Sequence, residues 1–534
     1  MPDQTTAPAA AADHDLSPLA PLRRPVFRML WLTWLAANTT MWMNDVASAW
    51  LMTSLAPSPL WVALVQSAGT LPVFLLGLPS GALADILDRR RFLMITQFWV
   101  AGIATVICIT VALGWMSAPL LLALTFANGV GLAMRWPVFA AIVPELVPRA
   151  QLPLALALNG VSMNASRIIG PLVAGAIIAA AGSAWVFALN AALSLVAGFT
   201  IMHWRREHKE SPLGRERLGS AMRVGVQYVR QSRRMRGVLV RIGLFFFHST
   251  ALLALLPLVA RALPGGGAGT FTVLLASMGG GAIIAALSVG RIRSLMPVQQ
   301  LLVAGTALQS AAMLAVAYAP NIYVAVPAMV FAGVAWITVA NTLTVTAQMA
   351  LPDWVRARGM SIYQMSLMGS TAAGAALWGQ VATWTTIHQS LAIAAVTSSA
   401  LMALAQRLLT DRGIEEDLTP ARVFQVPHAD APPRTGRVQV QIEYRIDPAR
   451  SADFMALMQE SRRSRMSQGA LDWQVMRDLY EPGRIVEQVT DESWTEHLRR
   501  FDRVTAADVR LRDRKLAFHV GQTPPVVSRF IIDP

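Results

Sequence analysis

The segment GPLVAG, Gly170–Gly175, recurs 204 positions later as GAALWG, Gly374–Gly379. Two further pairs of segments keep nearly the same offset: FANGVG from Phe126 with FAGVAW from Phe331, and Val147-Pro148 with Leu351-Pro352. Single glycine matches mean little in apolar sequence, but three matches at offsets of 204 or 205 predict a duplicated unit. Gly and Pro inside an apolar helix permit close packing and a local bend.

The repeated segments lie within long apolar runs. Hydrophobic residues make up 54% of the 534-residue chain and charged residues only 14%, whereas a soluble domain carries roughly 25%. A membrane-crossing helix needs about 20 mostly apolar residues, and we place twelve at 28–53, 60–84, 92–113, 119–141, 154–181, 184–204, 237–260, 268–291, 298–318, 321–348, 359–384 and 388–409. The repeats fall in the fifth and eleventh runs, so the duplicated unit is six helices long.

Basic residues alternate along these spans. With a cytoplasmic N-terminus, the outside loops hold only Arg261, as the excess of Lys and Arg in cytoplasmic loops requires. The net charge of +14 lies in the membrane part, because residues 437–534 hold 16 basic and 15 acidic groups. This distribution argues against a nucleic-acid partner. It predicts a multi-pass protein of a bacterial inner membrane with both termini cytoplasmic.

The chain divides into six expected parts. Residues 1–22 lack a signal-peptide pattern and are predicted to be a disordered tail. Two six-helix bundles are expected at 23–204 and 237–410, joined by a basic cytoplasmic loop at 205–236 that sets topology or contacts anionic lipid. A Pro-rich linker, 411–436, leads to residues 437–534, whose strand–helix–strand–strand–helix–strand pattern predicts a cytoplasmic ferredoxin-like α+β domain.

A basic turn follows the second span. It reads GALADILDRRR from Gly81 to Arg91 and resembles the loop signature of the major facilitator superfamily, with Asp85, Arg89 and Arg90 on matching positions. The sequence departs at Ile86, where a basic residue is common, and at Asp88, where Gly is common. The resemblance implies a cytoplasmic gate held by Asp85; a topogenic basic turn is the simpler interpretation.

Longer stretches extend the resemblance. SRIIGPLVAG, Ser166–Gly175, is similar to the Gly-Pro signature of exporters in that superfamily, which gives Gly170, Pro171 and Gly175 a bundle-packing role. From about 20 to 532 the chain resembles the bacterial transmembrane secretion effector family, which includes enterobactin-exporter-like proteins. The stretches that carry this likeness begin at Phe27 (FRMLWLTWLAANTTMWMNDVASAWL), Glu145 (ELVPRAQLPLALALN), Trp473 (WQVMRDLYEPGRIVE) and Ser493 (SWTEHLRRFDRVTAAD). The resemblance implies the major facilitator fold and a proton-driven exporter of siderophores or drug-like compounds.

Polar side chains within the spans are functional candidates, because ionisable groups are costly inside a bilayer. Asn38, Trp42 and Asp45 share one face of the first helix. An Asp45–Arg167 pair would let a carboxylate load and release a proton, the alternative being a static ion pair or a snorkelled Asp45. The remaining candidates are Asn164, His248, Asn341 and Arg135, the last close enough to the inner surface to snorkel. The Arg that many proton antiporters carry early in span four is absent from Leu121 to Phe126.

The C-terminal domain offers a second set of candidates. SWTEHLRRFDR resembles antibiotic-biosynthesis monooxygenase-like domains, with Trp494, His497 and Arg503 on matching positions. Such domains often pair as dimers, and some hold a substrate without a cofactor; the alternative is a core Trp494 and a surface His497. No catalytic triad, metal cluster, phosphate loop or cofactor motif is found in the sequence, and Cys108 is the single cysteine. Two functions therefore compete: an exporter with a regulatory or dimerising tail, and a membrane-tethered oxygenase or ligand sensor.

Overall fold

The computed structural model describes residues 17, 19–56, 58–86, 88–148, 151–204, 218–409, 417–421 and 436–532. These residues form two compact units. The first combines residues 1–214, 241–343 and 364–408, which hold most of both six-helix halves. The second combines residues 215–240, 344–363 and 409–534. Most of the expected tail and linker lies outside the described residues, but Ala20–Arg23 form a 3-10 helix, and Pro420 makes a β-bridge to Thr505.

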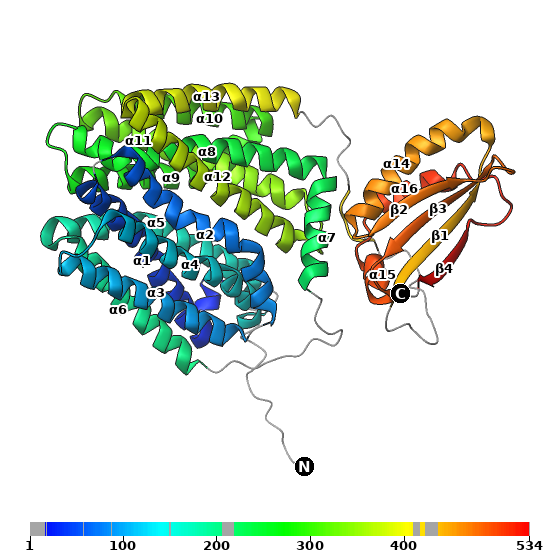
Figure 1. Ribbon diagram of the computed structural model, residues 1–534, viewed down its shortest axis with the longest axis horizontal. Helices are drawn as coiled ribbons and strands as arrows, with labels where there is room; N and C mark the ends of the chain where they lie inside the picture. The colour runs from blue at the N-terminus through cyan, green and yellow to red at the C-terminus, as the bar shows by residue number, and fades with distance from the viewer. Residues whose placement is uncertain are drawn as a thin grey trace, which may run out of the picture. The chain divides into compact units, whose positions relative to one another are not determined.

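A long helix occupies each of the twelve predicted spans (Figure 1). They are α1 (Pro25–Leu55), α2 (Pro59–Ile86), α3 (Arg89–Ala112), α4 (Ala118–Leu146), α5 (Leu152–Ala181), α6 (Ser183–His203), α8 (Arg233–Ala262), α9 (Ala268–Leu295), α10 (Val298–Ala317), α11 (Ile322–Met349), α12 (Arg356–Trp384) and α13 (Ile387–Leu408). Within the described residues, ten of them are long and apolar enough to cross a membrane. Helices α1 and α12 fall outside that group.

The two halves pack their helices in the same way. Helix α3 packs against α6 in the first half, and α10, seven helices on from α3, packs against α13 in the second (Figure 1). Gly170 of α5 touches α1, where an added Cβ would lie 2.6 Å from the Cβ of Trp42. Gly374 of α12 touches α8 in the equivalent way, against the backbone oxygen of Phe247. The 204-residue offset therefore marks equivalent packing positions within each half.

The second glycine of each repeat faces the opposite half. Gly175 of α5 leaves room for Thr272 of α9, with which any added Cβ would clash. Gly379 of α12 lies against α2, where a Cβ would come within 2.5 Å of the Cβ of Ala63. Each half thus presents one glycine to its own first helix and one to the other half's second helix. Such close approach between helices is the usual use of small residues in membrane proteins.

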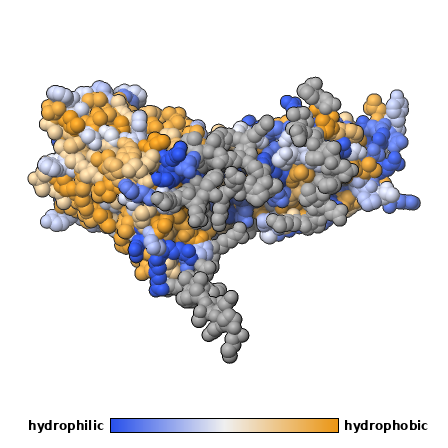
Figure 2. Space-filling view, turned by 90° about the horizontal axis from the view of Figure 1, so that it is seen from below, coloured by the Kyte–Doolittle hydropathy of each residue, from blue (hydrophilic) through white to orange (hydrophobic). Residues whose placement is uncertain are grey.

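The surface of the helical unit suits lipid. Figure 2 shows hydrophobic side chains spread over much of its visible face. Large apolar side chains are among the most exposed residues there, including Leu287, Tyr323, Val196 and Ile95. Water-exposed apolar surface of that extent marks a membrane or partner surface.

Residues predicted to be a loop at 205–236 contain a helix. Helix α7 spans Leu218–Gln231, and α8 begins at Arg233, four residues ahead of the predicted start. The described part of the predicted loop is therefore mostly helical. Val224 and Tyr228, one turn apart on α7, are both buried. Arg223 and Gln227 lie one residue before each of them and reach polar partners in the same unit.

The C-terminal part is a four-stranded antiparallel sheet covered by helices. Its elements are β1 (Arg437–Arg445), α14 (Ser451–Ser467), β2 (Asp472–Arg477), β3 (Arg484–Asp491), α15 (Trp494–Asp502), α16 (Ala506–Leu516) and β4 (Val526–Ile532), and the strand order is β2-β3-β1-β4. Alternate residues of β1, Val438 and Val440, pack with Val489 of β3. Phe454 and Met458 of α14 pack on Ile485. Because side chains alternate between the two faces of a strand, one face of β1 enters this core.

Candidate transport site and C-terminal module

The polar face of α1 is buried within the helical unit. Asn38 is fully buried, and neither its amide nitrogen nor its amide oxygen has a hydrogen-bond partner. The indole nitrogen of Trp42, one turn further on, is also unpartnered. Buried polar atoms are nearly always satisfied in proteins, by other residues or by ordered water. Unpaired groups on one helix face therefore mark a place that water or a ligand fills.

Arg167 of α5 lies between two indole rings. Its guanidinium carbon is 5.5 Å from the ring centroid of Trp42 on α1 and 5.5 Å from that of Trp336 on α11. Phe246 packs edge-on against Trp336, with ring centroids 4.9 Å apart. A cation over an aromatic face gains roughly 0.5–2 kcal/mol, the more so when it is shielded from water. The contact between Arg167 and Trp336 joins the first half of the chain to the second.

Asp45 and Arg167 do not form the ion pair that the sequence suggests. Asp45 is half-buried one turn beyond Trp42, and the described residues provide it with no hydrogen bond or ion pair. Arg167 is likewise free of any carboxylate partner in the described chain. The rings of Trp42, a candidate from the sequence, and Trp336, which the sequence pattern does not single out, take the place expected for the carboxylate.

The other predicted residues of the spans lie apart from this group. The Nδ1 atom of His248 is 2.7 Å from the carbonyl oxygen of Leu244, one turn earlier on its own helix, and the ring packs near Trp378. Asn341 is exposed, five residues beyond Trp336 and so on a different face of α11. The side chain of Asn164 lies outside the described residues. The structure therefore brings together Asn38, Trp42, Asp45 and Arg167, and adds Trp336.

Further contacts join the two halves near one end of the helices. Arg261, at the end of α8, donates a 2.6 Å hydrogen bond to the carbonyl of Thr53 on α1, and its guanidinium lies 5.1 Å over the ring of Trp50. Ser67 of α2 donates a 2.7 Å hydrogen bond to the carbonyl of Ala372 on α12. Arg261 was predicted to be the only basic residue of the outside loops. Its contact with Thr53 joins the end of α8 to the end of α1, and the charge pattern predicts that both ends lead into outside loops.

The basic turn after α2 is organised by Asp88 rather than by a glycine. The Asp88 carboxylate accepts a 2.8 Å hydrogen bond from the backbone of Arg91 and caps α3. This explains the departure from the Gly of the resembled motif, because a capping carboxylate satisfies an otherwise free helix N–H. Arg90 donates to the carbonyl oxygens of Ile201 and Met202 at the end of α6, where a cation is favoured. The side chains of Gly81 and Asp85 lie outside the described residues.

A buried charge network fills the centre of the C-terminal sheet. Glu487 of β3 is fully buried and accepts hydrogen bonds from Ser461 at 2.7 Å, Trp473 at 3.0 Å and Lys515 at 3.1 Å. Burial alone would raise the pKa of Glu487, but the charges of Lys515 and Arg465 hold it well below its usual range. Burial also lowers the pKa of Lys515 to about 8. This glutamate is a structural anion inside the module.

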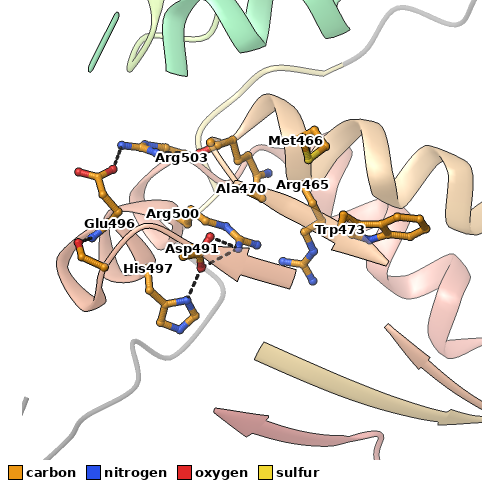
Figure 3. A network of polar contacts seen from close by, with 12 residues as sticks. Arg465, Met466, Ala470, Trp473, Asp491, Glu496, His497, Arg500 and Arg503 are labelled. Carbon is orange, nitrogen blue, oxygen red and sulfur yellow. Dashed lines mark hydrogen bonds and ion pairs between the residues drawn. The ribbon is translucent and has the colours of Figure 1, made fainter. Parts of the chain in front are cut away.

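His497 belongs to a second buried network, shown in Figure 3. Its Nδ1 atom lies 2.8 Å from Asp491, and Arg500 donates to both oxygens of the same carboxylate at 2.7 and 2.8 Å. Burial would raise the pKa of Asp491, but these partners lower it to about 2. Trp494 packs beside the His497 ring, with centroids 5.5 Å apart. The His497 ring is therefore fixed within the fold rather than displayed on the surface.

The C-terminal module contacts helix α7 within the second compact unit. Arg223 of α7 forms a 2.8 Å ion pair with Glu492, and Gln227 donates a 2.7 Å hydrogen bond to the carbonyl of Ala470. Arg503 of the module, which Glu496 holds at 2.8 Å, lies 5.3 Å over the ring of Trp354 in the turn between α11 and α12. Sequence reasoning missed both contacts, because their partners are more than 140 residues apart.

No metal site is evident. The described residues contain no cluster of three or more His, Cys, Asp or Glu side chains that could hold a metal ion.

Two related six-helix halves, an apolar outer surface and an unsatisfied polar group between the halves define a membrane transporter of the major facilitator superfamily. The chain belongs to the transmembrane secretion effector family, whose model matches residues 16–533.

Characterised relatives are similar over shorter segments. The staphyloferrin A transporter of Staphylococcus aureus (strain NCTC 8325 / PS 47) is 25% identical over 140 residues, which are 26% of this chain and 35% of that protein. Macrolide efflux protein A of Streptococcus pyogenes is 22% identical over 243 residues, 44% of this chain and 58% of that protein. The matches thus span about a third to three-fifths of these relatives' lengths.

Solved structures confirm the fold. A bacterial homologue of the human lysosomal transporter Spinster, in an inward-facing and unoccupied conformation, has a TM-score of 0.59 at 14% identity and covers 73% of this chain and 98% of that chain. The nucleoside transporter NupG has a TM-score of 0.59 at 11% identity and covers 73% and 100%. These likenesses extend to the helical part of the chain and say nothing of its cargo.

Proposed function

We propose that the protein is a proton-coupled exporter of a small molecule, a siderophore or a drug-like compound, which works by alternating access. In this proposal α1–α6 and α8–α13 make twelve crossings with both termini in the cytoplasm. The polar group of Asn38, Trp42, Asp45 and Arg167 is the cargo and coupling site. The single observation that carries the proposal is Asp45, a carboxylate without a partner among the described residues, one turn along α1 from Trp42, whose ring contacts the Arg167 cation.

The coupling step needs a carboxylate whose proton occupancy can change with access. Asp45 has no salt bridge to break among the described residues. Arg167, the cation of this group, is held instead by Trp42 and Trp336. Protonation of Asp45 removes the only acidic charge of this group. The unpaired amide of Asn38 and the indole N–H of Trp42 supply the neutral donors and acceptors that a polar cargo requires.

The cargo class is supported by the relatives' names. One relative is named for transport of staphyloferrin A, and another for efflux of macrolides. Both names denote polyfunctional small molecules. A site with one guanidinium, two indole rings and neutral polar groups suits a molecule that presents both an acceptor and an apolar surface.

The decisive experiment uses inside-out membrane vesicles that contain the full chain, with a labelled macrolide and a labelled iron-free carboxylate siderophore as separate probes. An imposed pH gradient should drive accumulation of at least one probe. Asp45→Asn should abolish accumulation while it retains exchange of that probe across the membrane without a gradient. Full gradient-driven accumulation by the variant would refute coupling at Asp45, and no accumulation of either probe by the wild type would refute the proposed cargo class.

For the C-terminal module, we propose a ferredoxin-like fold that regulates transport from the cytoplasm. The strand order β2-β3-β1-β4 and the contacts of Arg223 with Glu492 and Arg503 with Trp354 support this role. The same proposal includes dimerisation through the module and contact of the basic segment 205–236 with anionic lipid. Arg223→Ala should change the transport rate without changing the cargo, whereas Arg510→Ala, which removes an exposed pair with Asp417, should leave the rate unchanged.

The second candidate function is a membrane-tethered oxygenase or ligand sensor. The observation in its favour is the His497–Asp491–Arg500 network beside Trp494. Removal of residues 437–534 separates the two candidates. Retained export supports the transporter, and loss of a product made from a probe by the full chain supports the oxygenase.

A further inference from the structure

Arg135 is the largest fully buried side chain among the described residues, with 1% of its surface exposed. It lies on α4, in the first half of the chain, and the sequence placed it close enough to the inner membrane surface to snorkel. Instead its guanidinium carbon lies 5.2 Å over the ring of Trp34 on α1. Trp34 stacks on Phe139 with ring centroids 3.6 Å apart, which closes that side of the pocket.

The guanidinium has too few partners for its charge. One terminal nitrogen donates a 3.3 Å hydrogen bond to the Oε1 atom of Gln97 on α3. The Nε atom and the second terminal nitrogen are buried with no partner, and the described part of the chain offers Arg135 no carboxylate. An uncompensated buried charge is strongly unfavourable, because neither water nor an opposite charge stabilises it.

A small cavity adjoins these free donors. It has a volume of about 10 Å³ and holds a single small occupant. Polar atoms enter it from Arg135, Gln97 and Thr33, whose hydroxyl already donates to the carbonyl of Met29. Otherwise its wall is apolar, being formed by Leu30, Ala37, Leu93, Phe139 and Ile201. The cavity thus offers a fixed positive charge, two unused N–H donors and few other polar partners.

We propose that this cavity binds a single small monovalent anion of halide size, chloride being the natural occupant. The anion accepts hydrogen bonds from the free guanidinium nitrogens and neutralises the buried charge. A water molecule fits the volume but leaves the charge uncompensated, and it needs two to four polar partners. A whole carboxylate-bearing molecule is too large for the cavity. The proposal does not depend on Asp45 coupling, since its residues belong to α1, α3 and α4 and exclude Asp45 and Arg167.

The test measures the melting temperature of the purified full chain in detergent at constant ionic strength, while chloride replaces gluconate. Because a ligand that binds only the folded state stabilises it, chloride should raise the melting temperature by a shift on the order of 2 °C that saturates. Bromide should act similarly. Arg135→Gln should abolish the shift. Arg241→Gln is the matched control, because Arg241 also donates to a glutamine, Gln406, at 3.2 Å but belongs to the other half; it should keep the shift.

Equal melting temperatures in chloride and gluconate for the wild type would overturn the proposal and assign the cavity to water. A chloride shift that Arg135→Gln retains would overturn it as well, by placing the anion elsewhere. If that variant does not fold, crystals of the wild type grown in bromide decide the matter. An anomalous bromide peak beside the Arg135 guanidinium is expected, and its absence above the saturating bromide concentration would contradict the site.

Discussion

The guanidinium of Arg167 lies 5.5 Å from the ring centroid of Trp336, and the two residues belong to opposite halves of the duplicated chain. A second indole, that of Trp42, lies at the same distance on the guanidinium and belongs to the same half as Arg167. Separation of the halves would break the first contact and preserve the second. The contact with Trp336 is therefore expected to bias the balance between the two access states.

Replacement of Trp336 by Leu should shift that balance. Loss of a shielded cation–π contact of about 1–2 kcal/mol changes a two-state population roughly five- to thirtyfold. Gradient-driven transport in vesicles should fall, and labelling of a cysteine introduced at Asn38 should change in rate. Trp185→Leu is the control, since Trp185 is exposed on α6 and should leave both readouts unchanged. Wild-type transport and labelling in Trp336→Leu would show that the contact has no such role.

Gly175→Ala should impair transport, because its new Cβ would clash with Thr272 on the other half. Gly160, on the same helix, is the control position, because no heavy atom lies near the Cβ that an alanine would add. Gly160→Ala should stabilise the helix by about 0.5–1 kcal/mol. Initial transport rates and melting temperatures of the two variants test the difference. Equal behaviour of the two would mean that close approach at Gly175 is unimportant.

Asp491→Asn should destabilise the C-terminal module by about 3–5 kcal/mol, because Arg500 and His497 would lose their buried carboxylate. Hydrogen exchange of the β3 amides in the full chain measures this change. Asp502→Asn, an exposed change at the end of α15, should leave the exchange rates unchanged. Protection equal to the wild type in Asp491→Asn would contradict the structural role of this network.

Acid should loosen the module through the same residue. The pKa of Asp491 is about 2 in the folded module against 3.8 for the ordinary carboxyl, so the unfolded state binds more protons between these values. Its contribution, about 2 kcal/mol, is complete above pH 4 and is lost as the pH falls through 3.8 towards 2. Susceptibility of residues 437–532 to pepsin should rise across this window in the wild type. Asp491→Asn should lack that part of the rise, and an identical pH profile for both proteins would contradict the assignment.

Much of the fold follows from apolar run lengths and from the 204-residue offset. Apolar runs predicted the twelve helices because a bilayer-spanning helix has a required length, and the glycine pairs predicted equivalent packing positions because only small residues fit there. Helix α7 was missed, since it lies within 205–236, a segment rich in Arg that resembles a solvated connector. Its buried side chains find their partners far along the chain, Val224 at Gly469 of the C-terminal module and Tyr228 at Ala350 and Trp354.

The candidate site was predicted only in part. Asn38, Trp42 and Asp45 share a helix face and could be found by spacing, and Arg167 could be found by its charge. The contact of Arg167 with Trp336 could not be predicted. Trp336 is an aromatic residue in an apolar helix, and only the tertiary packing brings its ring to the cation. Glu487 was missed for a similar reason: an acidic residue in a strand gives no sign that Lys515, 28 residues later, will meet it in the core.

The central claim is that two six-helix halves move against each other during transport. Ser67 and Ala372 lie in contact across the halves, so Ser67→Cys with Ala372→Cys, in a chain carrying Cys108→Ser, places a single cysteine pair there. Gradient-driven transport in vesicles is measured before oxidation, after oxidation and after reduction. Oxidation should arrest transport and reductant should restore it. Undiminished transport by the fully cross-linked protein would contradict alternating access.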